Sequence, residues 1–540
     1  MESSFESCVA LPETGSKRRT FLQSGPHLSI ESHKNGTSWV HMGIQWWCQF
    51  LVSPAKKEYP VFRMLFAVCL AIPVLAFADG PIAVSNRPQL FIDNRFMAKS
   101  EGITLRMNQA QKLGRITDKD GGKLISAHVS RVYEVDGKVR LYTGVDWLDV
   151  YESDDGLQFT KIGSIASHGR VLTTVFIDPH ETDAAKRYKL FNIQLSSPFN
   201  PETDGVYAYT SADGIEFTDG IRVYPRYTDN PLVVWWDERI GKYVIYTRAL
   251  EADSENQRRI ARIEVDDPLQ PWPYTEAEHP HPFNSPKNMP VVLQADADDN
   301  PFSDIYYNAA TLYPLAQDAY FMFTAQFRHF SPNRNPYIRP RGEHWEDFGF
   351  LEIQLAVSRD GIHWERPSRE PYFPTGLADE WDRWYAVMCP GYAKRGNYLY
   401  QYYVSSGNTH DSAVVRPEYD GVKDLGGIGV VRQRVDGFVS ADADYRGGWI
   451  ETPLITFTGK TLRLNIDTGS MGIAFVELRD EAGTPIPGFT LADCEEIGGN
   501  YIDQAVYWKG NTDVSSLAGK PVRLYFKLIR AKVFSFTFSE

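Results

Sequence analysis

Three acidic residues, Asp146, Asp229 and Glu352, are placed so that carboxylates from distant segments could meet over one pocket. Hydrolysis of a glycosidic bond needs such a meeting, because one carboxylic acid protonates the leaving oxygen while a second carboxylate acts as base or nucleophile at the anomeric carbon. A third charged group can tune the pKa of the acid. We therefore interpret Asp146 as base or nucleophile, Asp229 as the orienting or tuning group, and Glu352 as the acid.

Seven further residues have side chains suited to holding a sugar beside those carboxylates. Aromatic rings can stack on a sugar face, while arginine, asparagine and histidine can hydrogen-bond hydroxyl groups. The predicted substrate-binding residues are His128, Trp147, Arg248, Asn308, Arg328, Tyr385 and His410.

Each catalytic assignment has an ordinary structural alternative. Asp146 could be a turn residue, and Asp229 could form an Asx-turn ahead of Pro231. Glu352 alternates with Leu351 and Ile353, so on a half-buried strand it could face solvent instead.

A repeated phrase indicates the elements that would position these residues. A strand pattern, an Asp-Gly turn and a later aromatic residue occur in YESDDGLQF (151–159), YTSADGIEF (209–217) and LEIQLAVSRDGIHW (351–364). Equivalent turn marks stand at Asp155, Asp213, Asp267, Asp360 and Asp436, the third being degenerate. Such a repeat indicates an architecture built from similar units.

Ahead of each turn mark the pattern predicts a hairpin of two strands. The hairpins fall at 128–147, 171–194, 230–250, 305–327 and 385–406. Five hairpins, each followed by a third strand and a turn mark, predict the blades of a five-bladed β-propeller. A large β-sandwich with coincidental turns is the alternative. In a propeller blade the first strand begins, the second ends and the third begins at one face near the axis, which is why the predicted site residues could converge.

The chain changes character after Asp436. Short strands of period-2 alternation follow up to Glu540, which is typical of a compact antiparallel sandwich. The expected fold class is therefore all-β, with a five-bladed β-propeller over 85–445 and a C-terminal β-sandwich accessory domain over 446–540.

The N-terminal region predicts export. Met64 to Ala78 reads MLFAVCLAIPVLAFA, with basic residues ahead of it and a small-x-small site at its end, as in a secretory signal peptide. We interpret residues 1–63 as a non-native or disordered extension, leaving open whether translation starts at Met1 or Met64. A buried core helix is the alternative for 64–78. The signal peptide predicts a secreted or periplasmic protein with no membrane attachment after cleavage.

The net charge and the cysteine content indicate which partners and cofactors the protein can be expected to bind. A formal net charge of −13 argues against nucleic acid as a general partner. After signal cleavage Cys389 and Cys494 would remain, far apart, and no Cys/His spacing predicts zinc, so no cofactor is expected. The stretch DADDNPFSD (296–304) could bind a structural calcium ion, with an acidic surface loop as the alternative. The oligomeric state is not indicated.

The sequence resembles a group of exported bacterial, glycoside-hydrolase-like five-bladed propellers. The resemblance lies in the repeated turns, in NPLVVWWDERIGKYVIYTR (230–248), and in GGWIETPLITFTGK (447–460) and DEAGTPIPGFTLADC (480–494). It covers roughly 85–540. The group is related in fold to the arabinanase/β-xylosidase and levanase/invertase enzymes.

The resemblance implies a carbohydrate partner and an exported enzyme that cleaves a glycosidic bond. Related enzymes place a base aspartate at the start of the first blade, where this chain has Ser126, Ala127 and His128. A non-catalytic carbohydrate-binding propeller therefore stays open. So does a glycoside phosphorylase or transferase, for which Arg248, Arg328 and His410 could supply the basic groups.

Overall fold

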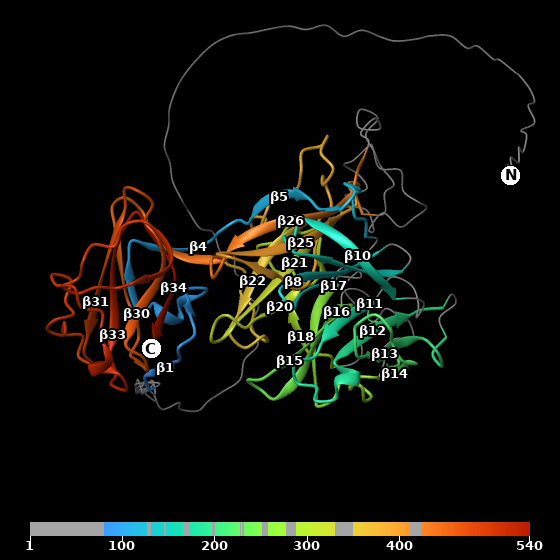
Figure 1. Cartoon of the computed structure of the whole chain (residues 1–540), viewed down its shortest axis with the longest axis horizontal. Coiled ribbons are helices and arrows are strands. Elements are labelled where there is room, and N and C mark those ends of the chain that lie inside the picture. The colour runs from blue at the N-terminus through green and yellow to red at the C-terminus, as the bar shows by residue number, and fades with distance from the viewer. Residues whose placement is uncertain are drawn as a thin grey trace, which may run out of the picture. The chain divides into compact units, whose positions relative to one another are not determined.

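The computed structural model describes residues 80–126, 131–144, 147–165, 173–196, 200–226, 228, 232–250, 258–276, 288–329, 349–410 and 424–540 (Figure 1). These belong to the compact unit Phe77–Glu540. In this part of the chain regular structure consists of strands and short 3-10 turns, so the expected all-β class is confirmed. The predicted extension and signal peptide lie outside the described residues. No helix within the described ranges is long and apolar enough to span a membrane.

Five antiparallel sheets follow one another along the chain and form the blades of a five-bladed β-propeller. Blade 1 contains β7 (Arg131–Val135), β8 (Lys138–Thr143), β9 (Leu148–Ser153) and β10 (Gln158–Ile165), with β6 (Thr117–Asp118) parallel to β10. Blade 2 contains β11 (Thr173–Ile177), β12 (Tyr188–Gln194), β13 (Gly205–Ser211) and β14 (Ile221–Tyr224). Blade 3 contains β15 (Val233–Asp237), β16 (Lys242–Leu250), β17 (Arg258–Val265) and β18 (Val291–Leu293). Blade 4 contains β19 (Ser303–Tyr307), β20 (Ala310–Tyr313), β21 (Ala319–His329) and β22 (Gly349–Ser358).

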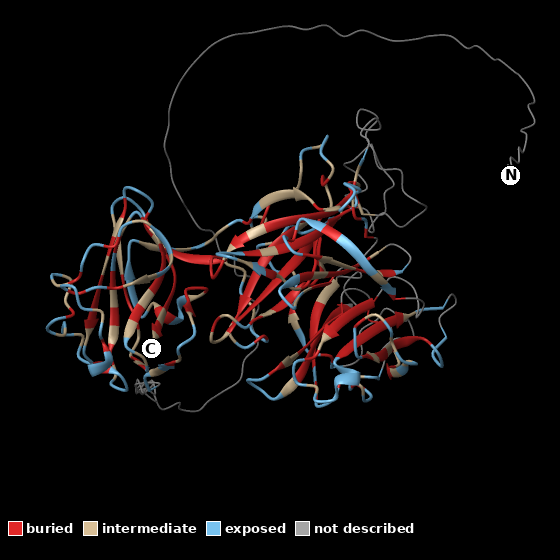
Figure 2. Ribbon diagram, viewed as in Figure 1, coloured by how far each residue is buried: buried red, intermediate tan, exposed pale blue. Residues whose placement is uncertain are grey.

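Blade 5 is completed by a strand from the other end of the propeller. It contains β23 (Val387–Met388), β24 (Ala393–Arg395), β25 (Tyr398–Ser405) and β26 (Gly427–Arg434), and β5 (Gln111–Arg115) pairs with β26. Because β5 precedes blade 1 in the sequence, this pairing ties the first blade to the last. Buried residues run along the strands of all five blades (Figure 2).

The repeated Ser-x-Asp-Gly turns link neighbouring blades. In the copy at the end of blade 4, the Asp360 carboxylate accepts the backbone N–H groups of Ile362 and His363, and the Ser358 hydroxyl accepts that of Gly361. Gly361 has a φ of 73°, a conformation that costs glycine little. The Tyr246 hydroxyl of blade 3 donates to the Gly361 carbonyl at 2.5 Å.

The same arrangement joins blade 1 to blades 5 and 2. Gly156 of blade 1 accepts a hydrogen bond from Tyr402 of blade 5, and Gly214 of blade 2 packs against Tyr142 of blade 1. Each tyrosine lies on the strand that pairs with the first strand of its blade, which is β16 in blade 3, β25 in blade 5 and β8 in blade 1. A turn that the sequence marks as a repeat is therefore also the contact between adjacent blades.

The β-sandwich consists of two sheets with strands from both ends of the described residues. One sheet contains β32 (Asn500–Ala505), β30 (Thr461–Asp467), β34 (Ala531–Ser539), β27 (Val439–Ala443) and β4 (Ile103–Met107), with β2 (Gln89–Leu90) on β34. The other contains β3 (Lys99–Glu101), β28 (Gly448–Glu451), β33 (Arg523–Ile529) and β31 (Ile473–Arg479). A parallel pair joins β1 (Ile82–Val84) to β29 (Ile455–Phe457).

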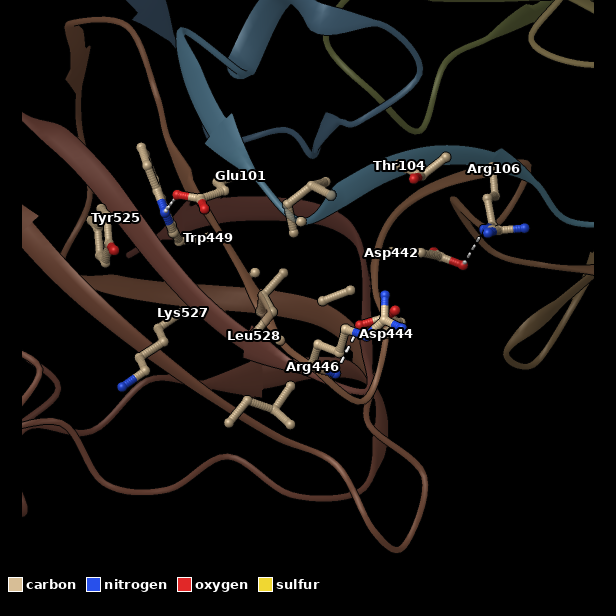
Figure 3. A pocket seen from close by; sticks show the side chains of 16 residues that line it. Glu101, Thr104, Arg106, Asp442, Asp444, Arg446, Trp449, Tyr525, Lys527 and Leu528 are labelled. Carbon is tan, nitrogen blue, oxygen red and sulfur yellow. Dashed lines mark hydrogen bonds and ion pairs between the residues drawn. The ribbon is translucent and has the colours of Figure 1, made fainter.

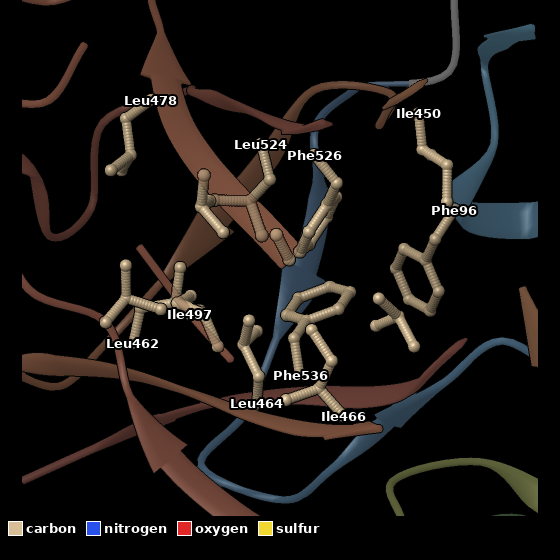
Figure 4. Close-up of a cluster of buried hydrophobic side chains, with 14 of the residues drawn as sticks. Phe96, Ile450, Leu462, Leu464, Ile466, Leu478, Ile497, Leu524, Phe526 and Phe536 are labelled. Atoms are coloured by element: carbon tan, nitrogen blue, oxygen red, sulfur yellow. The ribbon is translucent and has the colours of Figure 1, made fainter. Parts of the chain in front are cut away.

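The N-terminal strands therefore complete the sandwich, whereas the expectation had the propeller open at residue 85. Phe96, from the turn η1 (Asn94–Phe96), stacks edge-on against Phe536 at 5.1 Å. It lies in the core that the C-terminal strands form (Figure 4). The fifth turn mark, Asp436, is buried and joins the domains, because it accepts hydrogen bonds from Tyr313 of blade 4 and Ser535 of the sandwich.

Candidate active site

Three of the predicted site residues, Asp146, Asp229 and His128, lie outside the described residues. Asp146 follows the last residue of β8, Thr143, by three positions, and Asp229 precedes the first residue of β15, Val233, by four. Their predicted roles stay predictions.

Two predicted binding residues, Arg248 and His410, meet at Tyr306. The Arg248 guanidinium lies 4.4 Å from the centre of the Tyr306 ring, within the range of a cation–π contact. His410 Nε2 lies 3.0 Å from the Tyr306 hydroxyl. The three side chains come from blades 3, 4 and 5, so separate blades converge on one aromatic ring.

Aromatic rings surround this meeting point. Phe327 lies 5.5 Å from Tyr306 and 4.8 Å from His410, measured between ring centres. Tyr385, another predicted binding residue, is nearly parallel to His410 at 6.5 Å. We name Arg248, Tyr306, Phe327, Tyr385 and His410 the Tyr306 cluster.

A buried carboxylate adjoins the Tyr306 cluster. Asp304 lies at the start of β19, and its Oδ2 is 3.2 Å from the Arg258 guanidinium and 3.4 Å from His329 Nε2. Burial raises the pKa of this carboxyl, but the hydrogen bond from His329 and the charge of Arg258 outweigh burial and hold the pKa below its usual range. Asp304 is therefore suited to remain ionised and to orient the Arg258 and His329 side chains.

These residues occupy equivalent ends of their strands. Asp304 lies near the start of β19, the first strand of blade 4, and Arg258 lies at the start of β17, the third strand of blade 3. Arg248 and His329 lie near the ends of β16 and β21, the strands that pair with the first strands β15 and β19 of their blades. His410 follows the end of β25. The expected topological rule therefore holds for the described residues of blades 3 to 5.

Glu352 faces a different pocket. Phe327 belongs to a buried core cluster and pairs with Leu351, the residue before Glu352. Glu352 and Arg328 instead line a pocket of about 500 Å³. Consecutive side chains of a strand point to opposite faces of its sheet, so the blade 4 sheet separates Glu352 from Phe327. Gln354 donates a hydrogen bond to the Glu352 carboxylate at 3.2 Å.

The Glu352 pocket nevertheless alters the chemistry of its acid. Burial raises the pKa of Glu352, and the negative charge of Glu370 raises it further, although the hydrogen bond from Gln354 acts in the opposite direction. Trp384 lines the same pocket with a φ of 63°, a strained conformation for a bulky residue. A carboxyl group with a raised pKa is suited to donating a proton.

The other described binding residues, Trp147, Asn308 and Arg328, are not members of the Tyr306 cluster. Trp147 is 54% exposed in the connection between β8 and β9, and Asn308 is fully buried directly after β19. Arg328 lies over the ring of Phe350 beside Glu352. Of the three basic groups considered for a phosphorylase, Arg248 and His410 belong to the Tyr306 cluster, and Arg328 lines the Glu352 pocket.

The acidic stretch proposed for calcium pairs with arginines instead. Asp299 accepts hydrogen bonds from Arg366 at 2.8 Å and from Arg369 at 3.1 Å, and Asp296 contacts the same two guanidinium groups. In the ranges that the structure describes, no group of three or more His, Cys, Asp or Glu side chains is placed to hold a metal ion.

Sequence reasoning missed Asp304, Tyr306 and Arg258 as members of the site. The sequence pattern places Asp304 in the acidic loop, although its position at the start of a first strand could have identified it. Tyr306 had no comparable signal, because the strand register shifts between Ile305 and Tyr307. A bulge of this kind re-aims a side chain out of the regular alternation.

The fold and the site define a five-bladed propeller with an accompanying β-sandwich and an aromatic, cationic site across three blades. Neither a protein-family model nor a curated protein matches the sequence. Among solved structures the protein is similar to an exo-β-1,3-galactanase from Phanerochaete chrysosporium with galactose, at 10% identity and a TM-score of 0.34, over 79% of this chain and 100% of that one.

The protein is also similar to two glycoside hydrolases of family 43. One is a thermostable enzyme, with 13% identity and a TM-score of 0.37 over 59% of this chain and 94% of that one. The other is an arabinoxylan arabinofuranohydrolase from Bacillus subtilis in complex with cellotetraose, with 11% identity and a TM-score of 0.34 over 77% and 96%.

Proposed function

We propose that this protein is an exported glycoside hydrolase that binds a carbohydrate at the Tyr306 cluster. The observation that supports this function best is the convergence of Arg248, Tyr306 and His410 from three blades. Arginine and histidine can hydrogen-bond the hydroxyl groups of a sugar, and flanking rings can pack on its apolar face. Export rests on the signal-peptide pattern of residues 64–78.

The proposed reaction is cleavage of a glycosidic bond by water with paired carboxylates. Asp146 acts as base or nucleophile and Asp229 as the orienting group. In the sequence Asp146 follows the second strand of blade 1, β8, and Asp229 precedes the first strand of blade 3, β15. Ends of second strands and starts of first strands are also where the residues around Tyr306 lie. Water supplies the hydroxyl group of the new reducing end, and an acid protonates the leaving oxygen. Asp304 stays ionised and positions Arg258 and His329.

Glu352 is the proposed acid. Glu352 has the raised pKa that an acid needs, but its side chain lies on the opposite face of the blade 4 sheet from Phe327. This separation favours a second candidate function, in which the propeller binds a carbohydrate without cleaving it. A phosphorylase is less well supported, because Arg328 lines the Glu352 pocket rather than the Tyr306 cluster.

The test is a panel of plant and algal oligosaccharides, with binding measured by calorimetry and cleavage measured as released reducing ends. Wild type is compared with Asp146→Asn, Asp229→Asn and Glu352→Gln, and phosphate is included and omitted. Asp266→Asn, an exposed carboxylate on blade 3, is the control. Loss of a general acid or base should lower kcat by about 10²–10⁴-fold.

A glycan that binds but is never cleaved would show that the propeller is a binding domain, provided that the three substitutions alter only affinity. Cleavage that depends on phosphate would instead favour a phosphorylase. Cleavage that Asp146→Asn and Asp229→Asn leave unchanged would remove the proposed carboxylate pair.

A further inference from the structure

The β-sandwich carries a pocket of its own, of about 840 Å³ (Figure 3). That volume lies in the range of roughly 300–1,000 Å³ that small-molecule sites occupy. The pocket forms where the turn between β3 and β4 meets the turn between β27 and β28. A Cβ on Gly102 would lie 2.5 Å from the Gly447 carbonyl oxygen, so the two backbones touch there. The pocket therefore depends on strands from both ends of the described residues.

Two aromatic rings line one side of this pocket. Trp449 and Tyr525 are stacked, with ring centres 5.5 Å apart and an angle of 23° between their planes. The Trp449 indole N–H donates to the Glu101 carboxylate at 3.2 Å, which fixes the orientation of the ring. Figure 3 shows these three side chains together at one side of the pocket.

An arginine held by two buried glutamates packs against the Tyr525 ring of this pair. The Arg479 guanidinium lies 3.7 Å from the centre of the Tyr525 ring, as in a cation–π contact. That guanidinium is fixed by Glu451 at 2.7 Å and Glu477 at 2.8 Å, both of which are buried. Arg479, Tyr525 and Trp449 thus form a continuous stack ahead of any ligand, which lowers the entropy cost of binding.

Charged side chains along the pocket balance one another. The acidic residues are Glu101, Asp442 and Asp444, and the basic residues are Arg106, Arg446 and Lys527. A lining with equal numbers of both signs gives no net attraction to a polyanion or a polycation. It does supply both donors and acceptors for hydroxyl groups.

We propose that this pocket binds a neutral carbohydrate chain, with a sugar ring packed against the Trp449–Tyr525 pair and its hydroxyl groups bonded to the charged rim. This is a second carbohydrate site, separate from the one proposed on the propeller. It requires no catalysis, and its lining includes none of the residues placed in the Tyr306 cluster.

Affinity electrophoresis of the full-length protein in soluble arabinan, arabinogalactan and xylan tests the proposal, with polygalacturonate as the acidic comparison. The His410→Ala background reduces any contribution from the propeller. In that background at least one neutral polysaccharide should retard the protein, and Trp449→Ala should weaken the retardation by about tenfold. Tyr507→Ala, which removes a 40% exposed ring elsewhere on the sandwich, should leave retardation unchanged.

Arg446→Ala provides a second variant at an exposed rim position, where the fold is not at risk, and should weaken retardation about threefold. Unchanged retardation in Trp449→Ala, no retardation of the wild type by any neutral polysaccharide, or stronger retardation by polygalacturonate would each overturn the proposal. Release of reducing ends from short oligosaccharides is measured separately, and Trp449→Ala should not change it. A failure of this site is therefore distinguishable from a failure of the propeller as an enzyme.

Discussion

The two faces of the blade 4 sheet differ in chemistry although they share the same strands. On one face Phe327 contributes to the Tyr306 cluster, where aromatic rings and the Arg248 guanidinium from three blades meet. On the other face Glu352 and Arg328 line a pocket with the acidic loop of residues 298–300. Neighbouring residues of one strand, such as Phe327 and Arg328, therefore point into the two different environments.

The carboxylates beside these two faces also differ. Asp304 is almost fully buried, paired with Arg258 and His329, and has a lowered pKa. Glu352 is partly buried, is hydrogen-bonded to an amide, and has a raised pKa. The comparison shows that charge partners, and not burial alone, decide which carboxylate stays ionised.

Asp304→Ala should cause the largest change, because it removes the buried carboxylate that pairs with Arg258 and His329. Removing one member of a buried ion pair costs about 3–5 kcal/mol of unfolding free energy. Because the pKa of Asp304 is lowered by folding, its contribution is present above the unfolded pKa and is lost as the pH falls through the folded value.

Urea unfolding at neutral and acidic pH measures this effect. The difference between wild type and Asp304→Ala should shrink on acidification. Glu352→Ala is the comparison on the other face, and it should cost clearly less. An equal loss for both variants would remove the distinction between the two carboxylates.

His410→Ala should have the next largest effect, on carbohydrate affinity. It removes a ring that contacts Tyr306, Phe327 and Tyr385 together, so we expect a loss of about 10–100-fold in affinity, or roughly 1.4–2.8 kcal/mol. Arg328→Ala removes a comparable polar group from the opposite face and should change affinity by less than about threefold. Calorimetry with an oligosaccharide that the wild type binds measures both losses of affinity. A larger loss in Arg328→Ala than in His410→Ala would place the sugar in the Glu352 pocket.

The features of this fold that depend on local chemistry could be predicted from the sequence. The turns at Asp155, Asp213 and Asp360 are recognisable because an aspartate that caps backbone N–H groups and a glycine with positive φ form a short unit. The packing of each glycine against a tyrosine of the neighbouring blade could not be predicted, because that contact joins residues distant in sequence.

Non-local pairing explains what the sequence did not reveal. Sequence reasoning places the strands from Ile82 to Met107 largely in the propeller, yet their partners lie more than 300 residues away at Val439–Ala443 and beyond. Glu352 illustrates a different limit. Its alternation with Leu351 predicts two faces correctly, but the pattern does not say which face borders which pocket.

Tyr306→Phe isolates one hydrogen bond of the Tyr306 cluster. The substitution keeps the ring over which Arg248 lies and removes only the hydroxyl that contacts His410. A single hydrogen bond contributes about 0.5–1.5 kcal/mol, so carbohydrate affinity should fall by about two- to tenfold. Tyr507→Phe removes an exposed hydroxyl on the sandwich, outside the cluster, and is the control that should leave this affinity unchanged. An unchanged affinity in Tyr306→Phe would show that the ring, and not its hydroxyl, is what the site uses.

Among the stability effects predicted here, that of Glu352→Gln should be the smallest, and its pH dependence tests the other face of the sheet. Burial raises the pKa of Glu352, so folding is favoured by the protonated form, and stability is lost as the pH rises from the unfolded pKa through the folded one. Glutamine has no charge to bury and keeps a hydrogen-bonding group for Gln354. The variant should therefore gain thermal stability relative to wild type as the pH rises above this range, while the two should converge at acidic pH. Tm measured from acidic to neutral pH gives the sign, and a difference that does not vary with pH would mean that Glu352 titrates as a solvent-exposed carboxylate.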